Sequence, residues 1–204
     1  MDRNAEAWGE IMTLIPAFEI GVWNVWIFML YYLLTIPLMR LMSKDALGKS
    51  DVATPKHLYN KTEKRIVSFY QNSFIPALIY SIFLPLELGT TWFYIGLPIC
   101  LLGLIMLTIA YLNFATAPLD EPLTKGLYRY SRHPVYLTQA LMFIGVSIAS
   151  ASWIFLLFSI LRTIASFMLA IPEERHCLKV YGANYRAYMN RTPRWIGMPK
   201  SVAR

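Results

Sequence analysis

Long apolar runs are the feature that most constrains this chain. Five stretches carry few or no charges, at about residues 18–42, 66–88, 92–114, 135–149 and 153–171. A helix needs roughly 20 apolar residues to cross the hydrocarbon core of a bilayer, and several of these runs approach or exceed that length. With 56% hydrophobic and only 15% charged residues, the chain is predicted to be an all-α integral membrane protein with five transmembrane helices.

The length leaves room for one compact domain and no separate soluble domain of ordinary size, since the chain has 204 residues. Within that domain we expect an N-terminal three-span region over residues 1–122. Residues 123–204 would then form a helical hairpin with a cofactor-binding loop before it and a closing tail after it.

The basic residues predict an orientation for the spans. Of the 19 Lys and Arg residues, 17 lie in three segments: residues 40–65, the loop before residue 135, and the tail after residue 171. Cytoplasmic loops are enriched in Lys and Arg, and five spans place all three segments on one side. We therefore predict a multi-pass protein with its N-terminus outside and its C-terminus in the cytoplasm.

Several function classes are excluded by composition and spacing. The sequence pI is about 9.4, but the basic residues flank apolar runs and form no nucleic-acid-binding face. Cys100 and Cys177 make no disulfide framework. The histidines, His57, His133 and His176, lack the spacing of metal ligands, so no metal site is predicted.

The last two apolar runs are separated only by residues 150–152. So short a connection forces the two helices to be antiparallel neighbours. Small side chains on both helices suit close packing. These are Gly145, Ser147 and Ala149 on the first helix, and Ser159, Thr163 and Ser166 on the second.

A polar cluster stands at the mouth of this hairpin, in Arg132–His133–Pro134 with Tyr136. Pro134 suits the first turn of a helix, which puts His133 near the N-cap. The exposed amides and the dipole at a helix N-terminus favour an anion, with Arg132 beside it. The alternative interpretation is a positive cytoplasmic flank with a helix-starting proline.

Glu173 and Glu174 directly follow the second helix of the hairpin. Because the two helices are antiparallel, this places them on the same side of the membrane as His133. Acidic side chains are unfavourable at a helix C-terminus, so a ligand hydroxyl, amine or positive centre would explain them. The alternative is that they neutralise neighbouring arginines.

Arg162 is predicted to lie near the middle of the last span. A charged side chain there costs at least about 2.5–3.5 kcal/mol, which makes Arg162 a functional candidate. It would bind an acidic headgroup or carboxylate that enters from the bilayer, or form a structural bridge to Gln139 or Glu87. After Pro172 the helical spacing of tyrosines, with a break at Tyr181–Gly182, is also consistent with an amphipathic helix at the interface.

The motifs taken together resemble a known family. The pattern G-L-Y-R-x-S-R-H-P-x-Y is followed by the hairpin and then by E-E-x-x-x-L-x-x-x-Y-G-x-x-Y-x-x-Y and a terminal Pro–Arg segment. Over about residues 123–199 this is similar to the isoprenylcysteine carboxyl methyltransferases. That family belongs to a superfamily of integral membrane methyltransferases that includes phospholipid N-methyltransferases.

The resemblance implies an S-adenosylmethionine pocket closed by the hairpin and the tail. Its cofactor-binding residues would be Arg132, His133, Tyr136, Glu173, Glu174, Tyr185 and Tyr188. Arg194 would position the acceptor or close the tail, and Glu174, Arg194 and Arg162 are the candidate catalytic residues. Methyl transfer needs alignment and exclusion of water more than a strong acid or base.

The acceptor implied by the resemblance is a membrane-embedded or prenylated molecule, above all the carboxylate of an isoprenylcysteine-like substrate. Thr138 replaces a small glycine that the family often has, and residues 169–172 lack an arginine found in many members. These departures leave a phospholipid amine and a hydrophobic thiol open as acceptors. Membrane lipids are expected partners, nucleic acid is not, and the sequence indicates no oligomeric state.

Two other classes remain as alternatives. Membrane sterol reductases, which bind NADPH, end in a similar way, and Cys177, Lys179, Tyr181 and Gly182 echo them. A non-enzymatic membrane scaffold would use the polar cluster only as a topological flank. Binding of S-adenosylmethionine or of NADPH separates the three.

Overall fold

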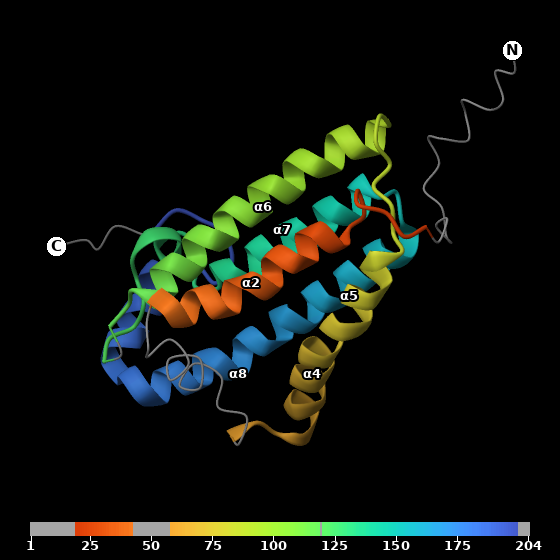
Figure 1. Cartoon of the computed structure of the whole chain (residues 1–204). Helices are drawn as coiled ribbons and strands as arrows, with labels where there is room; N and C mark the ends of the chain where they lie inside the picture. Colours follow the sequence, from red (N-terminus) through yellow and green to blue (C-terminus); the bar gives the residue numbers. More distant parts are fainter. Residues whose placement is uncertain (1–18, 43–57, 119, 200–204) are drawn as a thin grey trace, which may run out of the picture.

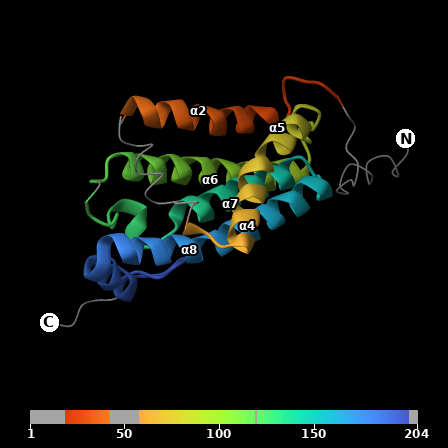
Figure 2. The ribbon, with the colours of Figure 1, turned by 90° about the horizontal axis from the view of Figure 1, so that it is seen from below.

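The computed structural model describes residues 19–42, 58–118 and 120–199, and in these ranges helices are its only regular elements apart from one isolated bridge (Figure 1). The α-helices are α2 (Trp26–Met42), α4 (Lys61–Asn72), α5 (Phe74–Ile82), α6 (Thr91–Ala115), α7 (Pro134–Ala149) and α8 (Trp153–Arg191), with a 3₁₀ turn η2 (Gly126–Arg129) before α7. Helices α2, α6, α7 and α8 run alongside one another, and α4 crosses them (Figure 2). The predicted all-α class is therefore confirmed for the described residues.

The predicted hairpin is present. Only residues 150–152 separate α7 from α8, and Ala151 turns the chain with a positive φ of 45°. Ser147 Oγ lies 2.8 Å from Ser159 Oγ, and Ser159 Oγ also donates to the Phe143 carbonyl at 3.2 Å. Small side chains thus let the two helix backbones approach closely, as the sequence predicts.

Helix α6 packs along α7 through glycines. A Cβ added at Gly96 or Gly103 would overlap the backbone of α7, and one added at Gly145 would overlap the backbone of α6 near Cys100. These contacts, with the buried side chains of Met142, Phe143, Val146 and Phe155, hold α7 at the centre of the bundle. The basic loop before α7 is therefore attached to a closely packed helix.

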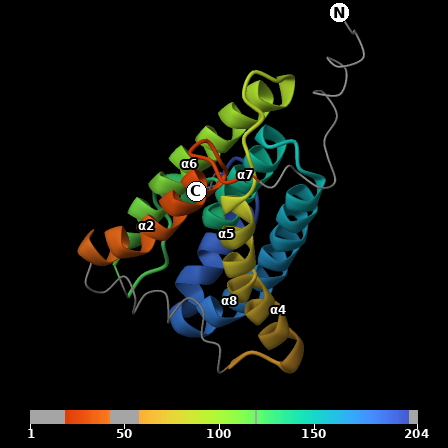
Figure 3. The same ribbon diagram turned by 45° about the vertical axis from the view of Figure 1, so that its right-hand side comes forward.

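The second predicted span is not one helix. It is divided at Ser73 into α4 and α5 and ends at Ile82, with α5 following α4 beside α8 (Figure 3). Pro76 accounts for the break, because it has no amide hydrogen and its ring disfavours a helical carbonyl four residues earlier, at Asn72. Neither piece by itself, at 12 and 9 residues, reaches the length needed to cross a bilayer.

Among the described residues, two helices are long and apolar enough to cross a membrane, Thr91–Ala115 and Trp153–Arg191. Shorter apolar helices run over Trp26–Thr35 and Pro134–Ala149. The helix of the first predicted span, α2, begins at Trp26, eight residues later than predicted. The count of five spans stays a prediction.

The tail does not form a separate helix after Pro172. Helix α8 continues through Pro172 to Arg191. Its geometry is interrupted at Gly182, whose φ of 53° and ψ of −122° are non-helical. A positive φ is accessible to glycine without a side-chain penalty, so the predicted break at Tyr181–Gly182 is confirmed as a kink.

The C-terminal end of α6, the turn η2 and the C-terminal part of α8 lie at the same end of the bundle (Figure 1). This is the end that carries the polar motifs. The apolar part of α8, residues 153–171, leads to it, and Glu173 and Glu174 follow directly after that part.

Candidate active site

His133 is the N-cap residue of α7, at the junction of the basic loop and the first helix of the hairpin. Its backbone N–H donates to Ser131 Oγ at 3.0 Å. Pro134 occupies the first helical position, where its missing amide hydrogen costs nothing. Only 8% of the His133 surface is exposed, so the ring is directed into the protein, toward α8.

Glu174 is the centre of an ion-pair cluster. Its Oε1 lies 3.0 Å from Arg132 NH2 and 3.2 Å from His133 Nε2. Its Oε2 lies 2.7 Å from Arg194 NH2. The hairpin, the loop and the tail are thus joined at one carboxylate that is only 3% exposed.

The surroundings of Glu174 stabilise its ionised form. Burial alone would raise its pKa, but the hydrogen bonds from His133 and Arg194, together with the charge of Arg132, lower the pKa to about 2. Opposite charges and donors close to a carboxylate favour ionisation. Glu174 is therefore a fixed negative charge at neutral pH and a weak base.

Glu173 has different neighbours. Tyr136 OH donates to its Oε1, and its Oε2 lies 3.6 Å from His133 Nδ1. None of the ion pairs among the described residues joins it to an arginine or lysine. Burial raises the pKa of Glu173 to about 8, partly opposed by the Tyr136 hydrogen bond, and the charge of Glu174 adds to the rise.

His133 stands between the two carboxyl groups. Burial lowers its pKa, and the charges of Arg132 and Arg194 add to this against the hydrogen bond to Glu174. The neutral ring is thus favoured. Because ionised Glu174 only accepts, the hydrogen bond assigns the proton to Nε2 and leaves a lone pair on Nδ1, facing Glu173.

Three hydrogen bonds to backbone carbonyls join the tail to the loop. Arg132 N–H donates to the Pro193 carbonyl at 3.1 Å, and Gly197 N–H donates to the Tyr130 carbonyl at 3.1 Å. Ser131 Oγ donates to the Arg194 carbonyl at 3.2 Å. Residues 192–197 thus form a strap across the polar cluster.

Trp195 is a member of the site that the motifs did not identify. Its ring stacks on Phe167 with centroids 4.0 Å apart, and it lies 5.8 Å from the His133 ring. His133 also stacks with Tyr136, with ring centroids 5.7 Å apart and an interplanar angle of 9°. Because Trp195 directly follows Arg194, its aromatic character next to the Pro–Arg segment was the available signal.

Tyr185 and Tyr188 come from the part of α8 beyond the kink, and both are buried. Their rings meet edge-on at 5.7 Å. Tyr188 OH donates to the Tyr128 carbonyl in η2 at 2.7 Å, and Arg132 NH1 donates to the Met189 carbonyl at 3.2 Å. The kinked segment therefore packs against the loop that carries Arg132, and the role of these tyrosines as walls of a cofactor pocket stays a prediction.

Arg162 is not part of this cluster. It is 4% exposed, and its NH1 donates to the Tyr70 carbonyl and to Ser73 Oγ, the latter at 3.3 Å. Its guanidinium lies 4.0 Å from the centroid of the Tyr70 ring. Arg162 thus binds the C-terminal end of α4 at the break, where free carbonyls favour a cation.

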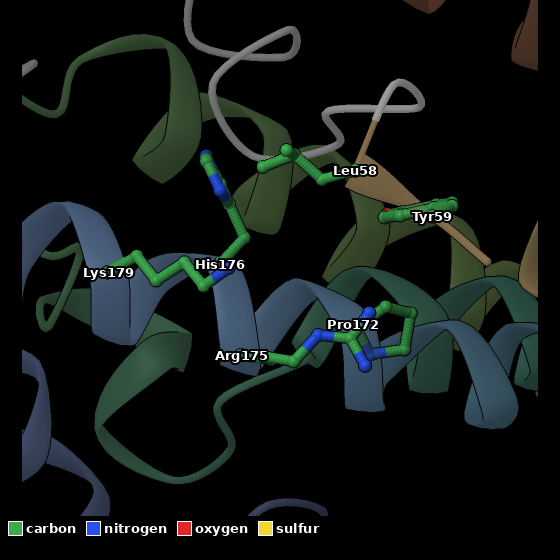
Figure 4. Close-up of a pocket in the computed structure, with 6 residues that line it drawn as sticks. All are labelled: Leu58, Tyr59, Pro172, Arg175, His176 and Lys179. Atoms are coloured by element: carbon green, nitrogen blue, oxygen red, sulfur yellow. The ribbon is translucent and has the colours of Figure 1, made fainter.

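A separate shallow pocket lies between α8 and the segment before α4 (Figure 4). Its lining residues are Leu58, Tyr59, Pro172, Arg175, His176 and Lys179. Arg175 is tied to Glu63, which forms the capping box of α4 with the N-cap residue Asn60, and its NH2 lies 2.9 Å from Glu63 Oε2. Glu63 thereby fastens the start of α4 to the same stretch of α8 that carries Glu173.

Sequence comparison adds the family. The profile of the phospholipid methyltransferase family matches residues 88–184. The match covers 97 of the 204 residues, a little under half of the chain. The matched region holds α6, α7 and most of α8, including His133, Glu173 and Glu174, so the membrane methyltransferase superfamily predicted from the motifs is confirmed.

One similar curated protein is methanethiol S-methyltransferase 1 of Bradyrhizobium diazoefficiens. It is 34% identical to this chain over 79 residues, which are 39% of this chain and 27% of the relative. The chain therefore aligns with about a quarter of the length of that relative. Both comparisons agree with the enzyme class predicted from the sequence, a membrane methyltransferase.

Proposed function

We propose that the protein transfers a methyl group from S-adenosylmethionine to a lipophilic acceptor that enters from the bilayer. The observation that carries this proposal is the cluster around Glu174. Its members Arg132, His133 and Glu174 lie inside the matched phospholipid methyltransferase region and come from the loop and the hairpin, whereas Arg194 lies beyond that region.

The chemistry of the cluster fits the amino-acid part of the cofactor, which carries a carboxylate and an ammonium group. Arg132 and Arg194 are planar donors suited to a carboxylate. Glu173 and Glu174 are acceptors suited to an ammonium group. Arg132 Nε is buried and has no hydrogen-bond partner among the described residues, so the cluster holds a donor that a ligand would satisfy.

The residues around Glu174 have the following roles in the proposal. Arg132, with Arg194 on the strap, binds the carboxylate, and Glu174 holds both arginines and the ammonium group. His133 and Tyr136 form an aromatic wall, and Tyr185 and Tyr188 form the wall nearest η2. When bound, the cofactor supplies an electrophilic methyl group, while the residues of this chain orient the acceptor and exclude water.

The strap is the element that closes the site in this proposal. Residues 192–197 are joined to the loop by hydrogen bonds whose loss would expose His133 and Glu174 to water. Excluding water prevents hydrolysis and strengthens the electrostatic contacts. Arg194 therefore acts in closing the tail, the role implied for it by the resemblance.

The site is proposed to face the cytoplasm, since the basic residues of the loop before α7 and of the C-terminal part of α8 lie at this end of the helices. The membrane lipids contact the exposed apolar side chains of α6, among them Leu101, Leu102, Ile105 and Ile109. The N-terminus would lie on the opposite side.

For the acceptor, the sequence resemblance supports an isoprenylcysteine-like carboxylate, the family match supports a phospholipid amine, and the curated relative is named for a thiol. All three are lipophilic or small enough to dissolve in a membrane. We therefore take S-adenosylmethionine-dependent methylation as the proposal and compare the acceptors by assay.

The test is binding and turnover by the purified full chain in lipid nanodiscs. Isothermal titration with S-adenosylmethionine and, separately, with NADPH is expected to detect only the former. Transfer of a radiolabelled methyl group is then followed with an S-farnesylcysteine carboxylate, phosphatidylethanolamine and 1-octanethiol. Binding of NADPH without S-adenosylmethionine would replace the proposal with the reductase alternative, and binding of neither would favour a scaffold.

Variants locate the site. Glu174→Gln is expected to weaken cofactor binding at least tenfold, because it removes the charge that holds two arginines. Glu121→Gln, an exposed carboxylate in the loop before η2, is the matched control and should bind as the wild type does. Equal binding by both variants would refute the site.

A further inference from the structure

We propose that the pocket between α8 and the segment before α4 is a binding site for an anionic phospholipid that is not the methyl acceptor. The pocket lies on the opposite face of α8 from Glu174, as the helix geometry below shows. The bound lipid holds the segment before α4 against α8 and takes no part in methyl transfer. This inference goes beyond the proposed function and does not depend on it.

The positions of the lining residues on α8 separate this pocket from the cluster around Glu174. Four of them are spaced at i, i+3, i+4 and i+7, which places them on one face of the helix. They are Pro172, Arg175, His176 and Lys179. Each residue turns an α-helix by about 100°, so Glu174, two positions after Pro172, projects about 200° away from it. A molecule in the pocket is therefore on the far side of α8 from the proposed cofactor site.

The side chains on this face suit an anion. Arg175 and Lys179 are cationic, His176 adds an imidazole, and none of the described residues that line the pocket is acidic. Arg175 bonds to both oxygens of Glu63 through NH2. A guanidinium has five N–H donors, so this ion pair does not use them all. Phosphate groups are bound in proteins by such combinations of Arg and Lys.

Tyr59 provides a second observation that points to a ligand. Its side chain is only 4% exposed, and its ring projects toward the other lining residues (Figure 4). The hydroxyl is buried and has no hydrogen-bond partner among the described residues. A buried donor without a partner is costly. A phosphate oxygen in the pocket would accept a hydrogen bond from it.

The carboxyl groups that act electrostatically on Tyr59 have other partners. They are Glu63 and Glu173. Glu63 Oε2 lies 2.9 Å from Arg175 NH2. Glu173 accepts a hydrogen bond from Tyr136. Neither carboxyl group accepts from the Tyr59 hydroxyl, so a basic flank that serves only membrane topology does not explain this buried donor.

The surroundings of the pocket favour a lipid over a soluble anion. Helix α8 is long and apolar enough to cross a membrane, and its apolar part ends directly before Pro172, at the level of the headgroups. Leu161, Met168 and Arg175 follow one another at intervals of seven residues, about two turns, and so share one face. Leu161 and Met168 are exposed. An acyl chain lies along them when the phosphate group occupies the pocket.

The test uses the full chain in maltoside detergent micelles, which contain no phosphate, and follows the thermal unfolding midpoint as ligand is added. Dioleoylphosphatidylglycerol carries phosphate and acyl chains, glycerol phosphate carries the phosphate alone, and dioleoylglycerol carries the chains alone. Phosphatidylglycerol has no amine, thiol or carboxylate, so it is none of the methyl acceptors considered above. We expect only phosphatidylglycerol to raise the midpoint, with saturation, because a ligand that binds the folded state stabilises it.

Two lysine variants separate the pocket from general attraction between a basic protein and an anionic lipid. Lys179→Gln and Lys125→Gln each remove one exposed lysine, and Lys125 lies outside the pocket, in the loop before η2. Lys179→Gln should weaken phosphatidylglycerol binding about fivefold, the effect of one basic residue at an anionic lipid surface, and Lys125→Gln by less than about twofold.

Tyr59→Phe tests the buried hydroxyl. Without lipid this variant should be at least as stable as the wild type, because it removes a buried donor that has no partner. It should nevertheless bind phosphatidylglycerol about tenfold more weakly, the value of a hydrogen bond to a charged group. A purely structural role for Tyr59 would not produce this opposite pair of effects.

Four outcomes would overturn this inference. They are an unchanged midpoint with phosphatidylglycerol, equal weakening by the two lysine variants, wild-type lipid binding by Tyr59→Phe, and an equal rise of the midpoint with glycerol phosphate. The last result would assign the pocket to a soluble anion. Since none of these measurements uses S-adenosylmethionine, failure of the proposed function would leave them unaffected.

Discussion

Arg194 and Glu174 join the tail to the helical hairpin, with Arg194 NH2 2.7 Å from Glu174 Oε2 and Arg194 Nε within 3.2 Å of both carboxylate oxygens. The two residues are 20 positions apart in the chain. The contact depends on the kink at Gly182 and on the strap that returns to the loop before α7. A motif in the tail is thereby placed against a motif in the hairpin.

Removing the charge of Glu174 should destabilise the fold as well as the site. In Glu174→Gln the nearly buried Arg132 loses its counter-ion, and breaking a buried ion pair costs about 3–5 kcal/mol. We expect the low end, about 3 kcal/mol, because the Arg194 side chain is 40% exposed and regains hydration. Thermal unfolding in nanodiscs measures this, and a midpoint equal to that of Glu121→Gln would contradict it.

Replacing Glu173 should stabilise the protein at neutral and alkaline pH. The pKa of Glu173 is raised to about 8 in the folded state, so folding favours its protonated form. As pH rises from about 4.5 to 8 the unfolded chain ionises first and wild-type stability falls. Glu173→Gln mimics the protonated form, so its advantage should grow over this window and vanish below pH 4.5. A constant difference across the window would disprove the assignment.

Lowering the pH should destabilise the fold through Glu174, which is the opposite of the effect expected for Glu173. Its pKa is lowered to about 2 in the folded state, so its contribution is complete above the unfolded value near 4.5 and is lost as pH falls toward 2. Unfolding midpoints measured from pH 6 to 2 should fall more steeply for the wild type than for Glu174→Gln. Parallel curves for the two proteins would show that Glu174 is not responsible.

Arg162→Lys should lower the stability of the fold and leave cofactor binding unchanged. Lysine cannot reproduce the planar donors that reach the Tyr70 carbonyl and Ser73, so the end of α4 loses satisfied hydrogen bonds. The expected cost is about 1–3 kcal/mol, with S-adenosylmethionine affinity within twofold of the wild type. An unchanged midpoint together with a raised KM for the acceptor would instead assign Arg162 to acceptor binding.

Gly145→Ala should separate α6 from α7. The added methyl would overlap the backbone at Cys100, and overpacking a tight contact costs about 1–3 kcal/mol. Ile105→Val, on the exposed face of α6, is the control and should change the thermal midpoint little. Equal midpoints for the two variants would mean that the helices yield at this contact without cost.

The sequence by itself determined the helical membrane class, the hairpin and the polar motifs at its mouth, because apolar run length and proline and glycine positions act locally. It also placed Glu173 and Glu174 near His133, since a three-residue connection leaves only one neighbour for each helix. It did not predict the break at Ser73, although Pro76 was visible, because the apolar run continued across it.

Only the tertiary structure decided the different surroundings of the two glutamates. They are adjacent in sequence and chemically identical, but successive positions on a helix point in directions about 100° apart. Glu174 thus meets Arg132, His133 Nε2 and Arg194, while Glu173 meets Tyr136 and His133 Nδ1. The pKa of a carboxyl group depends on such neighbours and on burial, and both are set by how the loop, the hairpin and the tail pack together.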